Sequence, residues 1–164
     1  MSISFENRVA IVTGAGGGLG KQHALELGRR GAKVVVNDLG GGVDGSGGSI
    51  SAAEDVAREI NEHGGIAMAN AASVTDLAAV QELIDETMSN WGRIDILVNN
   101  AGILRDKTFA KLEVENWHAV IDVHLNGSLN CTKLAWPIMT EQNYGRVVMT
   151  TSTSGLFGNF GQSN

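Results

Sequence analysis

The chain has 164 residues, of which 43% are hydrophobic and 18% charged, as in a globular protein that buries one apolar core. Its net charge of −6 argues against a nucleic-acid partner, because binding to phosphates needs clustered Lys and Arg. With no N-terminal signal core and no run of about 18 apolar residues, the sequence predicts no membrane partner and a cytoplasmic location. We therefore expect a small-molecule partner. The 22 glycines are nearly twice the usual share of about 7%.

Five short apolar or β-branched runs are typical of strands: 9–13, 33–38, 66–69, 94–99 and 145–151. Helical spacing of apolar residues occurs between them at 18–31, 52–63, 75–91 and 114–142, the last with a kink expected at Pro137. The alternation predicts an α/β fold, a Rossmann-like doubly wound parallel sheet with helices on both faces. The glycine-rich segment 40–51 could be an interdomain linker. We interpret it as a surface loop within one domain, residues 1–164, because the alternation continues through it.

A glycine-rich loop follows the first strand and precedes a helix, reading Thr13-Gly14-Ala15-Gly16-Gly17-Gly18-Leu19-Gly20. A helix N-terminus offers unpaired N–H groups and partial positive charge, so a pyrophosphate can dock there if side chains leave room. A nucleoside triphosphate P-loop is excluded, because Ala15 and Gln22 occupy two of its required positions. A purely structural turn remains the alternative. The cofactor-binding residues predicted in this loop are Gly14, Gly16, Gly18, Leu19 and Gly20.

Asp38 ends the second strand, where a carboxylate can accept hydrogen bonds from the adenosine ribose hydroxyls of a dinucleotide. The same charge would repel the 2′-phosphate of NADP, and neither Asn37 nor Leu39 supplies a compensating cation. The predicted cofactor is therefore NAD. Without the glycine loop, Asp38 could equally be a solvated carboxylate at a strand end.

Three features together resemble the short-chain dehydrogenase/reductase family over the whole chain: Thr13-Gly14-x-x-x-Gly18-x-Gly20, Asn99-Asn100-Ala101-Gly102, and a serine after the fifth strand. The sequence is most similar to the (3R)-hydroxyacyl-CoA dehydrogenases of peroxisomal multifunctional enzymes and their bacterial relatives. Four segments carry this closer resemblance: 37–41, 103–107, 123–125 and 155–162. It implies that Ser73 and Val74 flank the adenine, and that Asn99, Asn100, Ala101 and Gly102 line the adenosine ribose and the phosphates.

The resemblance also implies the catalytic chemistry. In this family a serine polarises the substrate oxygen, and a tyrosine transfers its proton with the help of a lysine four residues later. The candidate serine is Ser152, with Ser154 as second choice, although strand-end serines can also merely satisfy backbone groups. Counting from Ser152, the tyrosine would follow Asn164. We therefore expect the fold to be C-terminally incomplete and this chain alone to be inactive.

The predicted function is an NAD-dependent oxidoreductase that transfers hydride between NAD and a secondary alcohol or ketone, with a 3-hydroxyacyl-CoA as the implied substrate. A catalytically silent NAD-binding or interaction module is the alternative. The resemblance implies a homodimer or homotetramer at full length, and a peroxisomal location in a eukaryote. His124 stands where most of the family has a helix asparagine. No metal site is expected, because His118 and His124 fall on opposed faces of a helix.

Overall fold

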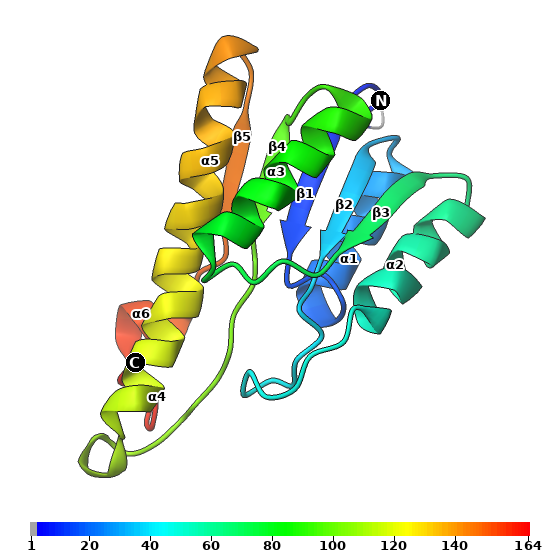
Figure 1. Ribbon diagram of the computed structural model, residues 1–164. Coiled ribbons are helices and arrows are strands. Elements are labelled where there is room, and N and C mark those ends of the chain that lie inside the picture. The colour runs from blue at the N-terminus through cyan, green and yellow to red at the C-terminus, as the bar shows by residue number, and fades with distance from the viewer. Residues whose placement is uncertain (1–2) are drawn as a thin grey trace.

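The computed structural model describes residues 3–164 and consists of a five-stranded parallel sheet with helices on both faces (Figure 1). The strand order is β3-β2-β1-β4-β5. This is the predicted Rossmann-like doubly wound arrangement. The elements in chain order are β1 (Val9–Thr13), α1 (Gly18–Arg29), β2 (Lys33–Asn37), α2 (Ser51–Glu62), β3 (Ile66–Asn70), α3 (Leu77–Trp91), β4 (Ile96–Asn99), the 3₁₀ turn η1 (Phe109–Lys111), α4 (Val114–Ile121), the π-helical turn η2 (Asp122–Asn126), α5 (Gly127–Glu141), β5 (Arg146–Met149) and α6 (Thr153–Phe157).

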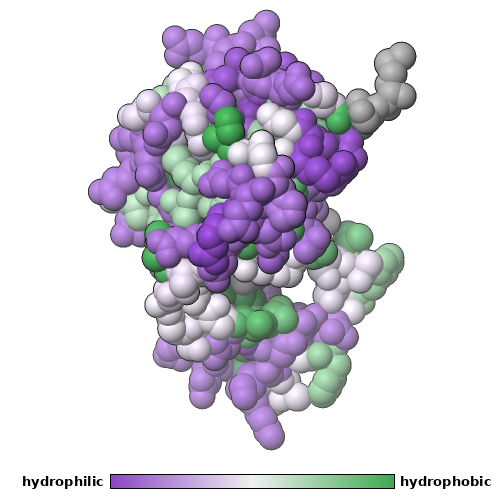
Figure 2. All heavy atoms as spheres, turned by 90° about the vertical axis from the view of Figure 1, so that its right-hand side faces the viewer, coloured by the Kyte–Doolittle hydropathy of each residue, from purple (hydrophilic) through white to green (hydrophobic). Residues whose placement is uncertain are grey.

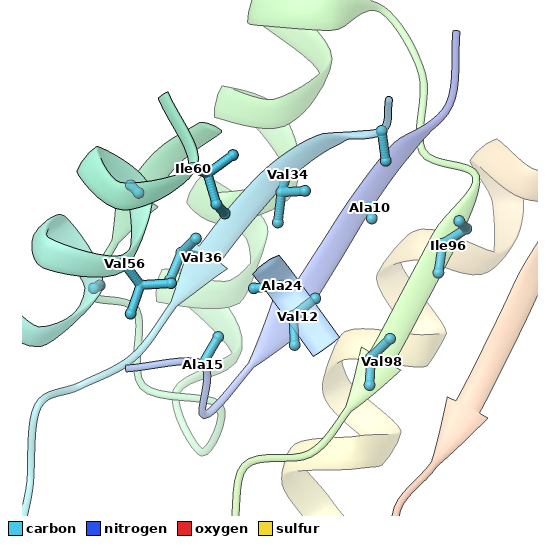
Figure 3. Packing of buried hydrophobic residues seen from close by; sticks show 13 residues of the cluster. Ala10, Val12, Ala15, Ala24, Val34, Val36, Val56, Ile60, Ile96 and Val98 are labelled. Atoms are coloured by element: carbon cyan, nitrogen blue, oxygen red, sulfur yellow. The ribbon is translucent and has the colours of Figure 1, made fainter. Parts of the chain in front are cut away.

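The core lies on both faces of the sheet, because every residue of β1 is buried. Side chains of a strand alternate between faces, so Ala10 and Val12 point to one side and Ile11 to the other. On the first side, Val36 of β2 lies against Val56 of α2, and Val12 lies next to Ala24 of α1 (Figure 3). On the opposite side, Ile11 packs with apolar residues of α3 and α5. Strands covered on both faces explain the uninterrupted apolar runs of the sequence.

The predicted strands and the first three helices agree with the structure to within two residues at each end. Local chemistry accounts for both ends of α3. The Asp76 side chain accepts hydrogen bonds from the N–H groups of Ala78 at 2.9 Å and Ala79 at 3.2 Å, which caps α3 at its start. Gly92 ends the same helix in the left-handed conformation, with φ of 69°.

The prediction of one helix over 114–142 is confirmed in its bounds, because helical backbone runs from Val114 to Glu141; what the sequence did not predict is the π-helical turn at Asp122–Asn126 between α4 and α5. Side chains satisfy the polar groups of this turn: the Ser128 hydroxyl donates to the His124 carbonyl at 2.6 Å, and the Asn126 amide donates to Asp122 at 2.7 Å. A π turn inserts an extra residue and changes which side chains face the sheet. Beyond it, α5 continues through Pro137 to Glu141.

A buried carboxylate joins the segments that precede β1 and β4, at the amino ends of these strands. Asp95 is fully buried and accepts hydrogen bonds from Arg8 at 2.8 Å, from the Val9 N–H at 2.9 Å, and from Arg93 at 2.6 and 2.7 Å. Burial raises the pKa of Asp95, but the hydrogen bonds from Arg93, Val9 and Arg8 outweigh that effect and hold it below its ordinary value. The guanidinium of Arg8 also lies 3.7 Å above the Tyr144 ring.

Large apolar side chains remain exposed on the side of β5 and along the later helices. Figure 2 views the molecule from the side of α2 and β3, opposite to β5, and there too hydrophobic patches appear in the lower half. From η1 to the end of the chain, the exposed large apolar residues are Phe109, Val114, Trp117, Leu125, Leu129, Trp136, Val148, Met149, Leu156, Phe157 and Phe160. Across residues 3–164, no helix combines the length and apolar character needed to cross a membrane.

Candidate functional site

The candidate site lies where β1 and β4 end side by side at the carboxyl edge of the sheet, the lower edge in Figure 1. The chain leaves β1 toward α1 on one face and β4 toward α4 on the other, so a crevice opens between the two connections. A cavity of about 630 Å³ occupies this position. Its walls come from the loops after β1, β2, β3 and β4 and from the turn between α4 and α5.

The glycine loop has the backbone conformation that its residues suggest. Gly14 and Gly18 have φ of 62° and 52°, in the left-handed region that side chains disfavour. A Cβ on Gly14 would lie 2.8 Å from the Ala101 Cα, and one on Gly20 would overlap the Gly14 carbonyl oxygen. A Cβ on Gly17 or Gly18 would meet no atom within 4 Å, so these residues border open space at the start of α1. The loop therefore packs closely against the protein at Gly14 and Gly20 and is open at Gly17 and Gly18.

Thr13 and Asn100 join the glycine loop to the end of β4. The Thr13 hydroxyl donates to the Val98 carbonyl at 3.3 Å and accepts from the N–H groups of Asn100 and Ala101, both at 3.0 Å. The Asn100 amide donates to the carbonyls of Thr13 and Gly14, both at 3.0 Å. The conformation of one loop therefore depends on the other.

The Asp38 carboxylate connects two glycine-rich segments. Its Oδ2 accepts a hydrogen bond from the Gly16 N–H at 2.7 Å, and its Oδ1 accepts one from the Gly40 N–H at 2.7 Å. Gly16 has no room for a side chain here, because a Cβ would lie 2.8 Å from the Asp38 Cγ and 2.9 Å from the Ala52 Cβ. The half-buried carboxylate faces the cavity and keeps lone pairs for further donors.

Ser73 and Val74 lie on the cavity wall that follows β3. The Ser73 and Thr75 hydroxyls are 2.9 Å apart, and the Val74 carbonyl accepts a hydrogen bond from the Asn130 amide at 2.9 Å. Val74 is buried against Gly127, where a Cβ would lie 2.6 Å from the Val74 Cγ2. The start of α5 thereby fixes this wall.

Asn99 points away from the cavity. Its side chain is 5% exposed, and its amide nitrogen lies 3.0 Å from the Thr132 hydroxyl of α5 and 3.3 Å from the Met149 sulfur of β5. Among the residues that the structure describes, the Asn99 Oδ1 has no hydrogen-bond partner although it is buried. This side chain connects β4 to α5 and β5 instead of lining the cavity.

Ser152 lies outside the cavity, two residues after the Thr150 N–H that bonds the Asn99 carbonyl at 3.0 Å. It is the N-cap of α6, and its hydroxyl accepts from the Ser154 N–H at 3.1 Å. A hydroxyl that accepts such a bond can still donate its own proton.

His124 packs against the loop after β4. Its Nε2 lies 3.0 Å from the Ile103 nitrogen and 2.9 Å from the Ile103 carbonyl oxygen, so its tautomer determines which of the two groups it bonds. Gly102 must be a glycine here, because a Cβ would lie 2.7 Å from the imidazole. His124 of the π turn therefore contacts Ile103, which lines the cavity.

The predicted residues fall into two groups. Those that line the cavity are Gly14, Gly18, Asp38, Ser73, Val74, Asn100, Ala101 and Gly102. Gly16 and Gly20 shape the loop from behind, Leu19 is 68% exposed beside it, and Asn99 and Ser152 lie elsewhere.

Several residues of the site were not predicted from the sequence. Thr13 is one of them, although it stands in a motif that indicated the family. Arg105 and four residues of the glycine-rich loop also line the cavity, with little local signal in the sequence; the four are Gly41, Gly42, Val43 and Gly45. Within residues 3–164, no three His, Cys, Asp or Glu side chains gather as a metal ion would require.

Comparison with known proteins agrees with this geometry. A family model described as short chain dehydrogenase matches residues 8–164. The peroxisomal multifunctional enzyme type 2 of Drosophila melanogaster is 54% identical over 162 residues, which are 99% of this chain and 27% of that protein. A putative short-chain type dehydrogenase/reductase of Mycobacterium tuberculosis is 52% identical over 159 residues, 97% of this chain and 56% of the relative.

A crystal structure of a short chain dehydrogenase from Mycobacterium avium superposes with a TM-score of 0.86 at 43% identity, covering 99% of this chain and 59% of that one. The chain therefore spans between 27% and 59% of the length of these three proteins. The match over nearly its full length shows that the chain belongs to the short-chain dehydrogenase family.

Proposed function

We propose that this chain is the NAD-binding part of a dehydrogenase that transfers hydride between NAD and a secondary alcohol or ketone. The observation that carries the proposal is the cavity at the ends of β1 and β4. It is bounded by the glycine loop at the start of α1 and by the Asp38 carboxylate. Membership in the short-chain dehydrogenase family implies a nicotinamide cofactor. The choice of NAD, the residue roles and the substrate are our proposals.

The residues fit a dinucleotide. Gly17 and Gly18 leave open space at the N-terminus of a twelve-residue helix, where backbone N–H groups and the helix dipole favour a pyrophosphate. Asp38 is within the same cavity, with acceptor capacity for two ribose hydroxyls. Ser73 and Val74 supply a wall for the adenine. When bound, the nicotinamide accepts or gives the hydride.

Two charges support NAD over NADP. Asp38 would repel a 2′-phosphate on the ribose that it binds. Arg105 is the one cationic residue among the described residues that line the cavity, and its guanidinium already donates to the Asp44 carbonyl at 2.9 Å and to Asn116 at 3.2 Å. A 2′-phosphate would therefore meet an anion without a free cation nearby.

Titration of the full-length protein with NAD and NADP tests this preference. We expect NAD to bind at least tenfold more tightly, since one unscreened charge contact is worth about 1.4 kcal/mol or more in a partly buried site. Asp38→Asn should reduce that ratio, and Asp85→Asn, which removes an exposed carboxylate of α3 outside the cavity, should not. Equal binding of both cofactors to the unmodified protein would contradict the proposal.

The resemblance and the named relatives support a 3-hydroxyacyl thioester as substrate. We propose that Ser152 donates a hydrogen bond to the substrate oxygen, and that residues 1–164 belong to one domain whose proton-transferring tyrosine and lysine lie beyond Asn164. The 164-residue chain by itself should then bind NAD without reducing it.

An activity assay separates the enzyme from a silent binding module. The full-length protein should reduce NAD with a 3-hydroxyacyl-CoA, and polypeptide 1–164 should show no turnover above background. Turnover by the isolated polypeptide would refute the assignment of the missing groups. A full-length protein that binds NAD but oxidises neither hydroxyacyl-CoA nor simpler secondary alcohols would favour the silent module.

We also propose a homodimer or homotetramer for the full-length protein. Trp117, Leu125, Leu129 and Trp136 are exposed along α4, η2 and α5, and such an apolar surface favours burial against another chain or segment. We further propose a peroxisomal location in a eukaryote, which the name of the Drosophila relative supports, and a cytoplasmic location otherwise. Sedimentation and localisation of the tagged full-length protein test these two points.

A further inference from the structure

The segment that follows Asp38 is a compact loop with a closed neck. The Ser49 N–H donates to the Leu39 carbonyl at 3.0 Å, and Gly40, with φ of 74°, lies so close to Ser49 that a Cβ would overlap the Ser49 carbonyl. A compact surface loop whose ends meet in this way is an Ω-loop. We call residues 40–49 the cover loop.

The cover loop has internal order despite its glycines. The Gly42 N–H donates to the Ser46 carbonyl at 2.7 Å, and the Gly45 N–H donates to the Gly42 carbonyl at 2.9 Å. The Asp44 carboxylate accepts from the Ser46 hydroxyl at 2.6 Å and from the Ser46 N–H at 3.0 Å, and these bonds hold its pKa below the ordinary value. The loop can therefore move as a unit about its neck.

The tip of the cover loop is fastened to the segment after β4. The Leu104 N–H donates to the Val43 carbonyl at 2.9 Å, and the Arg105 Nε donates to the Asp44 carbonyl at 2.9 Å. Arg105 is held in turn by Asn116 of α4, whose Oδ1 lies 3.2 Å from the guanidinium. In Figure 1 the cover loop, in cyan, and the yellow-green segment after β4 both extend below the carboxyl edge of the sheet.

The cover loop and the segment after β4, which these bonds join, both line the cavity of the candidate site. Gly41, Gly42, Val43 and Gly45 line the same cavity as Gly14 and Gly18 do, and so does Arg105. From residue 41 to residue 49 the chain is exposed, with few contacts that would resist its movement. Beyond the neck, the hydrogen bonds that the described residues make to this loop come from Leu104 and Arg105, and Gly45 lies beside Ile103, where a Cβ would come within 3.1 Å of the Ile103 Cγ2.

From this arrangement we infer that the cover loop closes over the adenosine diphosphate half of the cofactor, and that Arg105 is the positioning residue that latches it. The inference rests on the proposed NAD site. A bound dinucleotide leaves only after the latch opens, so the latch governs the dissociation rate. Arg105 is suited to this role because its planar guanidinium bonds the loop and α4 at once, which a lysine ammonium on a flexible stem does less well.

Stopped-flow dissociation of NAD and of ADP-ribose from the full-length protein tests the inference. Arg105→Met should raise the dissociation rate of both ligands by about tenfold, the effect of one lost charge-assisted hydrogen bond, with a smaller change in association rate. Arg105→Lys should restore part of the difference. Arg58→Met, which removes an exposed arginine of α2 outside the cavity lining, should leave both rates unchanged.

Hydrogen exchange on the ligand-free protein provides a readout independent of NAD. Arg105→Met should accelerate exchange of the Leu104 amide and leave core amides such as that of Val35 unaffected. If exchange of the Leu104 amide is unchanged in Arg105→Met, Arg105 does not latch the loop. If the variant binds NAD normally and its dissociation rates are unchanged, the loop does not cover the cofactor, but the proposed NAD site is unaffected. If neither NAD nor ADP-ribose binds the unmodified protein, the proposed function fails, and the covering role fails with it.

Discussion

Replacing Asn100 with alanine should weaken both the fold and the cofactor site. The substitution removes the two hydrogen bonds by which the Asn100 amide holds the Thr13 and Gly14 carbonyls at 3.0 Å. A typical hydrogen bond contributes about 1 kcal/mol net, so the free energy of unfolding should fall by about 2 kcal/mol. If the released glycine loop must be reordered on binding, the same loss of about 2 kcal/mol raises the dissociation constant of NAD roughly 30-fold.

Asn61 offers a matched control. Its side chain also makes two hydrogen bonds to backbone, with the N–H and the carbonyl of Ala67 at 2.7 and 3.0 Å, but it lies outside the cavity. Asn61→Ala should therefore lower stability by a similar amount and leave NAD affinity unchanged. Urea unfolding and calorimetric titration of the full-length variants measure both quantities. Equal losses of affinity in the two variants would mean that general destabilisation, and not the loop, controls binding.

The remaining predictions concern separate parts of the molecule. Asp95→Asn should lower the free energy of unfolding by about 3 kcal/mol at pH 7, because charge-assisted bonds to Arg8 and Arg93 are lost. The pKa of Asp95 lies below its ordinary value of 3.8, so the stability that this carboxylate contributes is complete above about pH 4 and is lost as pH falls through the folded-state pKa. The free energy of unfolding should therefore fall less steeply with acid in the variant. An unchanged dependence of stability on pH would contradict this role of Asp95. Gly20→Ala should lower stability by roughly 1 to 3 kcal/mol, because its Cβ would overlap the Gly14 carbonyl, whereas Gly17→Ala should remain close to the unmodified protein in thermal unfolding. Burial raises the pKa of the Cys131 thiol to about 11, so iodoacetamide at pH 8 should label it only after unfolding; rapid labelling of the folded protein would show that the thiol is accessible. Ser152→Ala should lower kcat of the full-length protein by about 100-fold if its hydroxyl stabilises the reacting oxygen, and an unchanged kcat would leave it only the capping role.

Much of the sheet could be predicted because burial on two faces leaves a clear pattern in the sequence. Val9 to Val12 and Val34 to Val36 are short apolar runs bounded by polar residues, and both lie in central strands. The glycine loop could be predicted because its backbone conformation and close packing require glycine at fixed positions, and the spacing of these glycines is visible in the sequence. These features depend on neighbours in the sequence, which a single chain reveals.

The parts that escaped prediction depend on contacts between distant segments. The π turn at 122–126 accompanies the contact of His124 with Ile103, 21 positions earlier, and the helical spacing of 114–142 gives no sign of it. The direction of the Asn99 side chain depends on its register opposite Met149. The latch between Arg105 and Asp44 joins residues 61 positions apart, and loop composition alone does not encode such a pairing.

The two hydrogen bonds of Asp38 have a consequence for redesign of the cofactor preference. A protein engineer who replaces this carboxylate to admit NADP also removes the acceptor that aligns Gly16 with Gly40. Substitution by a cationic side chain would place donors opposite donors at both positions. A successful exchange would therefore need a second change that supplies a new acceptor for these two N–H groups, and single substitutions at residue 38 should lose NAD binding before they gain NADP binding.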